Sequence, residues 1–489
     1  MKKLIIVFSI LFYCTACEKF LDVQPETELT PELALSDQES IVTALNGAYS
    51  GLQAQGYYGM QFVIIGDASS DNGKIPSDRE AAGANSDRIP FAYTLDINAV
   101  NTADEFWLDG YEIIAKVNNI LTRLDEVEFE TAFENRVRGE CLALRAMTHF
   151  DLSRVFAQDY NFSQDQSHLA VPYIFETIPG STPERNTIGE VYDFALTDIQ
   201  EAIGLLDGPD VISQRGLRNG DDFYFANYYM ALGVLARMHF YATDYNNALQ
   251  VANQIIDGPY ELSDYTLGNY TPDALDEMEF INEWYSLAPI IEDEAIMQLD
   301  TDEDDGDFAS RSYIDIFVAN NGNAAHAISD DLLDLYEPAD LRRNWYKIEQ
   351  IDYHVFKYPG GLGLDADAHA IALMRLSEFV LMAAECEARI GDADRARSLV
   401  NLITERANAS TITSMGDQLI ENIITERQKE LAFEGHRLYD LKRLQRGFER
   451  IDCTLTNGNC TVSYPSNLYA WPIPISEINA NPSIEQNPI

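Results

Sequence analysis

The stretch LSEFVLMAAECEARIGDADRARSLVNLITERA at 376–407 decides the fold class of this chain. Its first half contains small residues such as Ala383 and Ala384, which allow another helix to approach closely. Gly391 can end this first helix and Asp392 can cap a second one, in which small and apolar residues recur every three or four positions. Large and small side chains that alternate over two antiparallel helices are typical of tetratricopeptide-like repeats.

A second helix pair of the same kind lies at 223–257, FYFANYYMALGVLARMHFYATDYNNALQVANQIID. Small residues again fill its first helix, and Asp244 can cap its second helix. Further stripes of helical period fall within 107–121, 141–155 and 192–206. Because the two pairs are far apart and follow no fixed period, we predict a mainly α fold: an interrupted tetratricopeptide-like scaffold rather than a free solenoid.

Long polar insertions separate these helices. Residues 68–105 are rich in Gly, Asn and Asp, and residues 258–330 contain several tyrosines, Trp284 and the acidic run DTDEDDGD at 300–307. Loops of this length within a compact protein are usually functional. The tail at 464–489 is rich in Pro and Asn, and we expect it to lie as coil across the surface.

Composition and charge exclude one class of ligand. Hydrophobic residues make up 46% of the 489 residues, which is enough for a large core. The formal net charge of −47 argues against nucleic acid binding, because phosphate groups would be repelled. A solubility adaptation explains this charge most simply, and a preference for cationic or calcium-bridged ligands is the alternative.

The acidic run at 300–307 resembles a calcium loop only in part. Its glycine, Gly306, stands one place late, and Arg311 occupies the position at which such a loop has its twelfth-place Glu. We therefore expect no cofactor, with a calcium ion in this run as the minor alternative.

The N-terminus reads MKKLIIVFSILFYCTACEKF. A basic start, a short apolar core and small residues before a cut are typical of a secretory signal peptide. The apolar run is shorter than the roughly 20 residues that a membrane-spanning helix needs. We predict a lipoprotein signal peptide at 1–16, cut before Cys17, whose thiol would then carry lipid. A plain signal peptide that happens to contain a cysteine is the alternative.

The other cysteines fall into two groups. Cys141 and Cys386 lie in helical patterns and are expected to be buried. Cys453 and Cys460 enclose an Asn-Gly turn signal that could bring the two thiols together, so we predict a disulfide between them in an oxidising compartment.

Several motifs follow one another along almost the whole chain with uneven spacing. They are EKFLDVQPE (18–26), LNGAYSGL (45–52), WLDGYEIIAKVNNIL (107–121), GECLALRAMTHFDLSRVFA (139–157), ITERQKELAFEGHRLYDLKR (424–443) and WPIPISEINANPSIEQNPI (471–489). In this order they resemble the SusD/RagB family of Bacteroidetes outer-membrane lipoproteins.

The resemblance implies a single large domain in which an N-terminal region at 17–220 and a C-terminal region at 221–489 pack as one globular unit. It also implies a lipid-anchored, surface-exposed protein of the outer membrane that binds nutrients, most often glycans. Such a protein would deliver its ligand to a SusC-like TonB-dependent transporter.

The motif at 424–443, called here the C-terminal signature, is rich in charge. Its charged residues at helical spacing include Glu426, Arg427, Glu430, Glu434, Arg437, Asp440 and Arg443. We expect them to form ion pairs that lock the last helices onto the scaffold rather than to catalyse a reaction. The sequence contains no G-x-S-x-G elbow, no H-E-x-x-H motif and no Walker loop. We therefore predict a glycan-binding protein that is not an enzyme. The alternatives are a receptor for a non-glycan nutrient, such as peptide or protein fragments, and, less favoured, a surface hydrolase.

A glycan-binding site needs flat aromatic rings for the C–H faces of sugars and polar groups for the hydroxyls. Most aromatic residues of this chain are expected in the core, so those in the insertions are the candidates. The predicted ligand-binding residues are Trp284, Tyr285, Tyr93 and Tyr270, with Asp67, Asn72 and Asn101 as polar partners.

Overall fold

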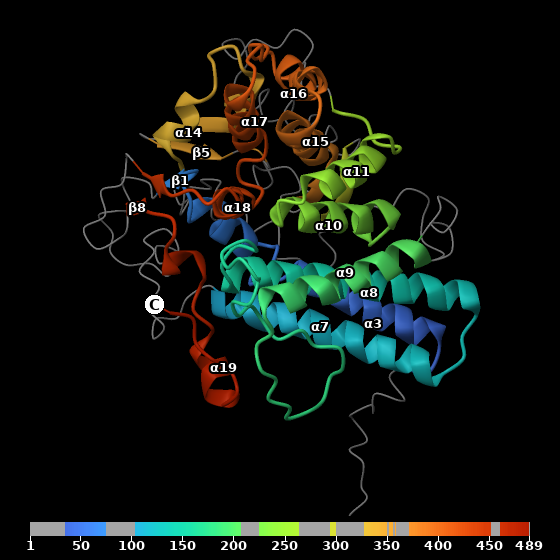
Figure 1. Ribbon diagram of the computed structural model, residues 1–489. Coiled ribbons are helices and arrows are strands. Elements are labelled where there is room, and N and C mark those ends of the chain that lie inside the picture. Colours follow the sequence, from blue (N-terminus) through green and yellow to red (C-terminus); the bar gives the residue numbers. More distant parts are fainter. Residues whose placement is uncertain are drawn as a thin grey trace, which may run out of the picture.

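The computed structural model describes residues 35–74, 103–206, 224–263, 294–299, 327–349, 352–355, 357, 371–450 and 460–488. Helices dominate this part of the chain, as the sequence pattern predicts (Figure 1). None of the helices among these residues is both long and apolar enough to span a bilayer.

Four helices from the N-terminal half lie side by side in the lower part of Figure 1. They are α3 (Gln38–Leu52), α7 (Ala103–Glu126), α8 (Thr131–Phe156) and α9 (Ile188–Leu205). Capping boxes begin two of them: Asp37 and Ser40 at α3, and Thr187 and Glu190 at α9. Helix α8 packs against both α7 and α9 and is buried on all sides along most of its length.

The two predicted helix pairs are confirmed. They are α10 (Tyr228–Tyr241) with α11 (Tyr245–Ile256), and α15 (Leu376–Ile390) with α16 (Ala393–Arg406). Asp244 and Asp392 are N-caps, because their side chains accept hydrogen bonds from backbone N–H groups of the first turn. Helix α11 packs against α15, so two pairs that are distant in sequence are neighbours in space. Helix α10 also contacts α8 and α9, which joins the described parts of the predicted regions 17–220 and 221–489.

The C-terminal signature forms the second half of helix α17 (Asp417–Glu430) and the short helix α18 (Arg437–Arg443). The turn between them contains Phe433 and Gly435, both with positive φ. A Cβ atom on Gly435 would lie 2.3 Å from Cδ1 of Phe62, so only glycine fits this approach of the turn to the N-terminal half.

Among the described residues, the strands form short antiparallel pairs rather than an extended sheet. The pairs are β1 (Gly73–Lys74) with β3 (Ala327–Ile328), β2 (Ala295–Leu299) with β6 (Ile371–Arg375), β4 (Tyr346–Glu349) with β5 (Asp352–Val355), and β7 (Phe448–Glu449) with β8 (Thr461–Val462). Short helical turns complete the described elements: α4 (Gln61–Val63), η1 (Ile64–Ala68), α14 (Asp330–Asp334), η6 (Leu341–Trp345), η7 (Asn467–Tyr469) and α19 (Ile475–Ala480).

The C-terminal tail corrects the expectation of a surface coil at 464–489. The side chain of Trp471 is fully buried in the main core. The backbone N–H of Trp471 donates to the carbonyl of Val155 (3.0 Å), and Nδ2 of Asn487 donates to the carbonyl of Phe156 (2.8 Å). Carbonyls in the last turn of a helix have no partner within that helix, so the tail acts as a cap for α8.

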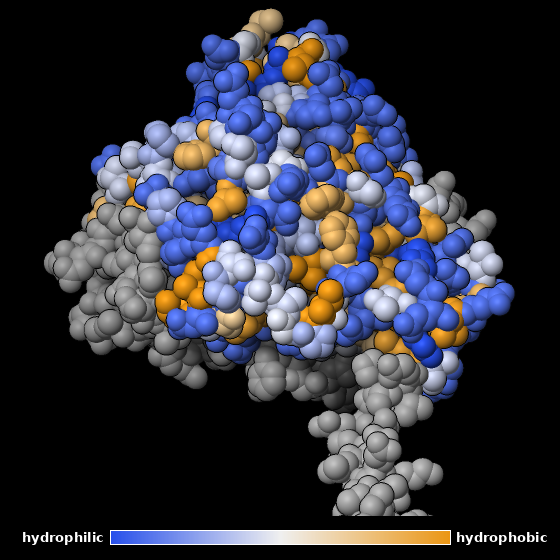
Figure 2. Space-filling view, turned by 60° about the horizontal axis from the view of Figure 1, so that its bottom comes forward, coloured by the Kyte–Doolittle hydropathy of each residue, from blue (hydrophilic) through white to orange (hydrophobic). Residues whose placement is uncertain are grey.

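The molecular surface agrees with the polar composition. Hydrophilic side chains cover most of the face shown in Figure 2, and hydrophobic ones appear in small scattered groups. The exposed large hydrophobic residues include Leu108 on α7 and Phe162, Phe175 and Ile178 in the connection between α8 and α9. Singly exposed apolar residues are normal on a soluble surface, so these do not define a site by themselves.

Candidate functional site

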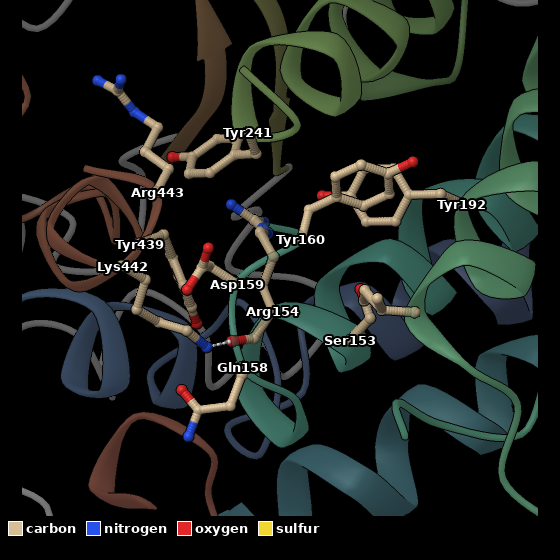
Figure 3. A pocket seen from close by; sticks show the side chains of 11 residues that line it. Ser153, Arg154, Gln158, Asp159, Tyr160, Tyr192, Tyr241, Tyr439, Lys442 and Arg443 are labelled. Atoms are coloured by element: carbon tan, nitrogen blue, oxygen red, sulfur yellow. Dashed lines mark hydrogen bonds between the residues drawn. The ribbon is translucent and has the colours of Figure 1, made fainter. Parts of the chain in front are cut away.

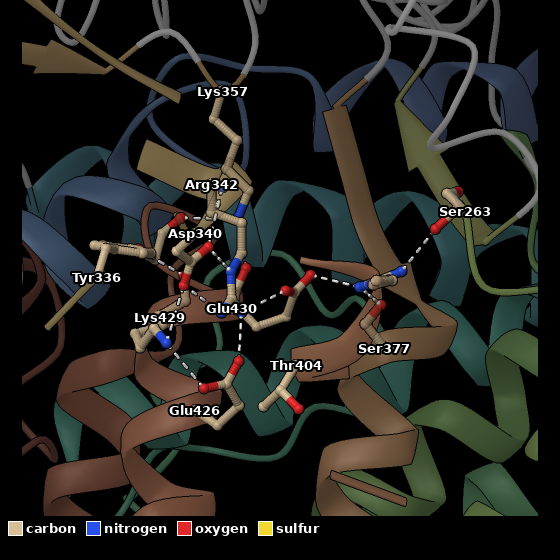
Figure 4. A network of polar contacts seen from close by, with 12 residues as sticks. Ser263, Tyr336, Asp340, Arg342, Lys357, Ser377, Thr404, Glu426, Lys429 and Glu430 are labelled. Atoms are coloured by element: carbon tan, nitrogen blue, oxygen red, sulfur yellow. Dashed lines mark hydrogen bonds and ion pairs between the residues drawn. The ribbon is translucent and has the colours of Figure 1, made fainter. Parts of the chain in front are cut away.

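The charged residues of the C-terminal signature form a buried network instead of a surface cluster (Figure 4). The Glu430 carboxylate accepts from Arg342 Nη1 (3.0 Å), Arg375 Nη1 (2.8 Å) and Arg406 Nη2 (2.7 Å). Burial by itself raises the pKa of this carboxyl, but the guanidinium groups of Arg406, Arg375 and Arg342 hold the pKa far below its ordinary value. The Glu430 carboxylate is therefore ionised, and it connects three arginines in the interior.

The second half of the signature joins α18 to α15. The carboxylate of Asp440 accepts from Arg427 Nε (2.9 Å) and Arg443 Nε (2.7 Å), and both terminal nitrogens of Arg443 donate to Glu385 at 2.8 Å. Burial, followed by the charges of nearby arginines, lowers the pKa of His436, so this side chain is neutral in the interior. The prediction that the signature locks the last helices onto the scaffold through ion pairs is confirmed.

Asp67 and Asn72 do not lie on a binding surface. Both are almost completely buried, and Nδ2 of Asn72 donates to Oδ1 of Asp67 (2.6 Å). The backbone N–H of Gly435 donates to the other oxygen of Asp67, and Gln428 donates to the amide oxygen of Asn72. Burial raises the pKa of the Asp67 carboxyl to about 7. The structure corrects the prediction for these two residues: they attach the N-terminal half to the α17–α18 turn.

The other predicted site residues fall outside the described part of the chain. They are Tyr93, Asn101, Tyr270, Trp284 and Tyr285, together with the anchor candidate Cys17, the acidic run at 300–307 and Cys453. Cys460 is disulfide-bonded, but its pairing with Cys453 stays a prediction. Cys141 and Cys386 are buried, as expected.

The described residues that flank the insertions are held by specific contacts. The backbone N–H of Ser263 donates to the carboxylate of Glu294 (3.0 Å), so the two sides of the segment 264–293 meet. Lys74, the last described residue before 75–102, pairs in register with Ala327, the first one after 300–326. Sequence reasoning missed Glu294, because it is the third of three consecutive acidic residues at 292–294 and no local pattern distinguishes it from its neighbours.

A small pocket lies where α18 meets α8 and α10 (Figure 3). The guanidinium of Arg154 lies over the rings of Tyr439 (4.6 Å to the centroid) and Tyr241 (5.4 Å), and it pairs with Asp151. Nζ of Lys442 donates to the carbonyls of Arg154 and Ala157, the latter at 2.7 Å. The pocket is thus a junction at which a lysine of the signature caps the end of α8.

The acidic side chains of the C-terminal signature are paired with cations in the described part of the chain. Within the described ranges, no group of three or more His, Cys, Asp or Glu residues could hold a metal ion. The carboxylates of Glu430, Glu434 and Asp440 each accept from at least two cationic side chains. These carboxylates therefore take part in ion pairs that join neighbouring elements of the described structure.

Two family models match the chain. The SusD family matches residues 336–489, and a family described as "Starch-binding associating with outer membrane" matches residues 19–215. SusD-like protein P38 of Formosa agariphila is 25% identical over 547 aligned positions, which cover 99% of each chain.

Solved structures agree with these matches. A putative sugar-binding protein from Bacteroides vulgatus is 27% identical, with a TM-score of 0.74 over 92% of this chain and 98% of that one. A SusD superfamily protein from Bacteroides thetaiotaomicron, at 24% identity, shares the fold with a TM-score of 0.78 over 92% of this chain and 100% of that one. Because the two family models together cover well over half of the sequence and the relatives align over almost all of it, the chain belongs to the SusD/RagB family.

Proposed function

We propose that this protein is a non-enzymatic, glycan-binding lipoprotein of the outer membrane. The observation that carries the proposal is the likeness, over nearly the full length, to a solved protein described as sugar-binding. The family description, which names starch binding and association with the outer membrane, supports the same class of ligand and the same location.

We place the binding surface on the insertions, with Trp284, Tyr285, Tyr270 and Tyr93 as stacking platforms and Asn101 as a polar partner. Flat aromatic rings suit the C–H faces of sugars, and side-chain amides both donate to and accept from hydroxyl groups. The composition of the insertions supports this placement, because a folded core does not need aromatic rings in long polar loops.

The proposal has two further parts. A lipid-modified Cys17 would tether the protein, since each buried CH₂ of an acyl chain adds about 0.8 kcal/mol of membrane affinity and stable anchoring takes more than one chain. A SusC-like TonB-dependent transporter would then receive the captured glycan from the protein. The motif order of the sequence and the family's association with the outer membrane support both parts.

The test is affinity electrophoresis of the protein lacking residues 1–17 through gels that contain one soluble polysaccharide each. Retardation by a polysaccharide that keeps its chain length supports the proposal. Release of reducing ends would favour a surface hydrolase. Retardation by none of the polysaccharides, together with binding to peptides, would favour the peptide receptor.

Trp284→Ala tests the placement of the binding surface. Loss of a stacking ring should weaken binding about two- to tenfold, as measured by the change in retardation with glycan concentration. Phe162→Ala is the matched control, because Phe162 is an exposed aromatic residue outside the insertions. Equal retardation of Trp284→Ala and the unmodified protein would remove Trp284 from the site.

A further inference from the structure

Three buried side chains around the pocket where α18 meets α8 and α10, called here the Arg154 pocket, carry polar atoms without a hydrogen-bond partner among the described residues. These atoms are Nε and Nη1 of Arg154 and the hydroxyls of Tyr241 and Tyr439. All three side chains line the pocket, and each residue is more than nine-tenths buried. A buried donor without a partner costs free energy, so several of them around one pocket point to a bound species.

The geometry of Arg154 leaves two of its nitrogens available. Its Nη2 donates to the carboxylate of Asp151, and the N–H groups on Nε and Nη1 have no such acceptor among the described residues. In Figure 3 the side chain lies between Tyr241 and Tyr439 on one side and Tyr160 on the other. The ring faces attract the cation, but they are weak hydrogen-bond acceptors and do not replace an acceptor in the guanidinium plane.

Cationic side chains dominate the lining of the Arg154 pocket. Arg154, Lys442 and Arg443 contribute to it, whereas Asp159 is its one acidic residue. Lys442 donates to two backbone carbonyls, which uses two of the three N–H groups of an ammonium. The Asp159 carboxylate already accepts from the hydroxyl of Tyr464 (2.5 Å).

The carboxylates that pair with the two arginines are not part of the lining. Asp151 pairs with Arg154, and the other arginine of the pocket pairs with Glu385 (2.8 Å) and Asp440 (2.7 Å). The cations therefore border the pocket while their acidic partners lie behind them. This arrangement favours a negatively charged occupant, because opposite charges attract more strongly where water is largely excluded.

We propose that the Arg154 pocket binds a small monovalent anion of halide size, such as chloride. The pocket has room for little more than about one water-sized body, so phosphate, sulfate and sugar rings are too large. An anion only accepts hydrogen bonds and can therefore satisfy Arg154 and both tyrosine hydroxyls at once. A water molecule must also place its own hydrogens, for which Oε1 of Gln158 is an acceptor, so water is the competing occupant.

The anion would join three elements that are distant in sequence. Arg154 belongs to α8, Tyr241 is the last residue of α10, and Tyr439 lies on α18. A species that binds only the folded arrangement raises the stability of the protein with its concentration. This inference goes beyond the proposed function and does not depend on glycan binding.

Thermal scans in sodium chloride and in sodium gluconate at equal ionic strength test the proposal. Gluconate is too large for the pocket, so general screening is matched while specific binding is not. With a dissociation constant of about 10 mM, about 0.1 M chloride should raise Tm by about 1–2 °C over gluconate, and the gain should level off at higher concentration. Equal Tm values in the two salts would overturn the proposal.

A double variant, Tyr241→Phe with Tyr439→Phe, ties the effect to this pocket. It removes only the two hydroxyls and should lose at least half of the chloride-specific gain in Tm. Tyr111→Phe is the matched control, because it removes a hydroxyl that donates to the carbonyl of Pro172 (2.8 Å), outside the pocket lining. The control should keep the full gain, and an undiminished gain in the double variant would contradict the proposal.

A crystal of the unmodified protein soaked in sodium bromide gives a direct measurement that needs no variant. Bromide scatters anomalously and is close to chloride in size. An anomalous peak within hydrogen-bond distance of Arg154 and the hydroxyls of Tyr241 and Tyr439 is the expected result. A water molecule without anomalous signal in the pocket, or adventitious ions at the surface only, would refute it.

Discussion

Glu430→Gln is the sharpest test of the buried network. The carboxylate of Glu430 receives hydrogen bonds from Arg342, Arg375 and Arg406 and has no solvent-exposed side-chain surface (0%). Glutamine has nearly the same shape, but it removes the charge and turns one acceptor into a donor that faces guanidinium groups. Breaking a buried ion pair from one side typically costs about 3–5 kcal/mol, because the partner charge stays buried without compensation.

The cost converts into a measurable change in melting temperature. An unfolding entropy of about 2.1 cal/mol/K per residue gives about 1 kcal/mol/K for 489 residues. A loss of about 4 kcal/mol in unfolding free energy should therefore lower Tm by about 4 °C in differential scanning calorimetry.

The pH dependence of this loss has a defined sign. Glu430 has a folded pKa far below its ordinary value, so its stabilisation is present above the unfolded pKa of 4.5 and disappears as the pH falls toward the folded pKa. The difference in Tm between Glu430→Gln and the unmodified protein should therefore persist from neutral pH to about pH 5 and shrink only in stronger acid.

Glu421→Gln is the control for this prediction. It lies on the same helix, α17, and pairs with Arg446, but the side chains of the two residues are 47% and 39% exposed. Exposed pairs contribute about 0–1 kcal/mol, so Tm should fall by no more than about 1 °C. Equal losses of Tm in the two variants would refute the reasoning that burial makes the Glu430 network stabilising.

Three further predictions concern other parts of the chain. Lys442→Met removes the donor to the carbonyl of Ala157 and should lower Tm by about 1–3 °C in thermal scans. Burial lowers the pKa of Lys442 from 10.5 to about 7, so between these pH values the unfolded chain binds more protons than the folded protein. The unmodified protein should therefore gain stability relative to Lys442→Met as the pH rises from about 7 to about 9. An equal pH response of the two proteins would contradict this. A disulfide between Cys453 and Cys460 predicts two fewer reactive thiols in the denatured, unreduced protein than after reduction, and thiol labelling without any such difference would disprove it. Cys17→Ala should move the protein from the membrane fraction to the soluble fraction of the cells, and an unchanged distribution would exclude anchoring through this residue.

The helical pairs could be predicted because their signals are local. Asp244 and Asp392 bind N–H groups only two or three residues away, and the spacing of small residues repeats within each helix. Such contacts involve residues only a few positions apart, so their signal is visible in the local sequence. The expectation of a mainly α, tetratricopeptide-like scaffold held for this reason.

Which polar and tail side chains are buried could not be predicted in the same way. Asp67 and Asn72 lie in a polar stretch that favours a loop, yet a short π-helical turn and the close approach of Gly435 bury both of them. Trp471 lies in a tail rich in Pro and Asn, yet it enters the core, where the tail supplies hydrogen-bond donors to carbonyls at the C-terminal end of α8. Both corrections arise from contacts between residues that are hundreds of positions apart.

The sequence by itself determined the helices, their caps and the family to which the chain belongs, because these depend on side-chain periods and motifs that act over a few residues. Only the tertiary structure decided which charges pair. Nothing in the sequence around Arg375 shows that it binds Glu294, Glu430 and Glu434, since each of these partners is brought to it by the packing of α15, α16 and α17. The physical reason is that a buried charge is stable only beside its partner, and that partner is selected by the folded arrangement of the whole chain.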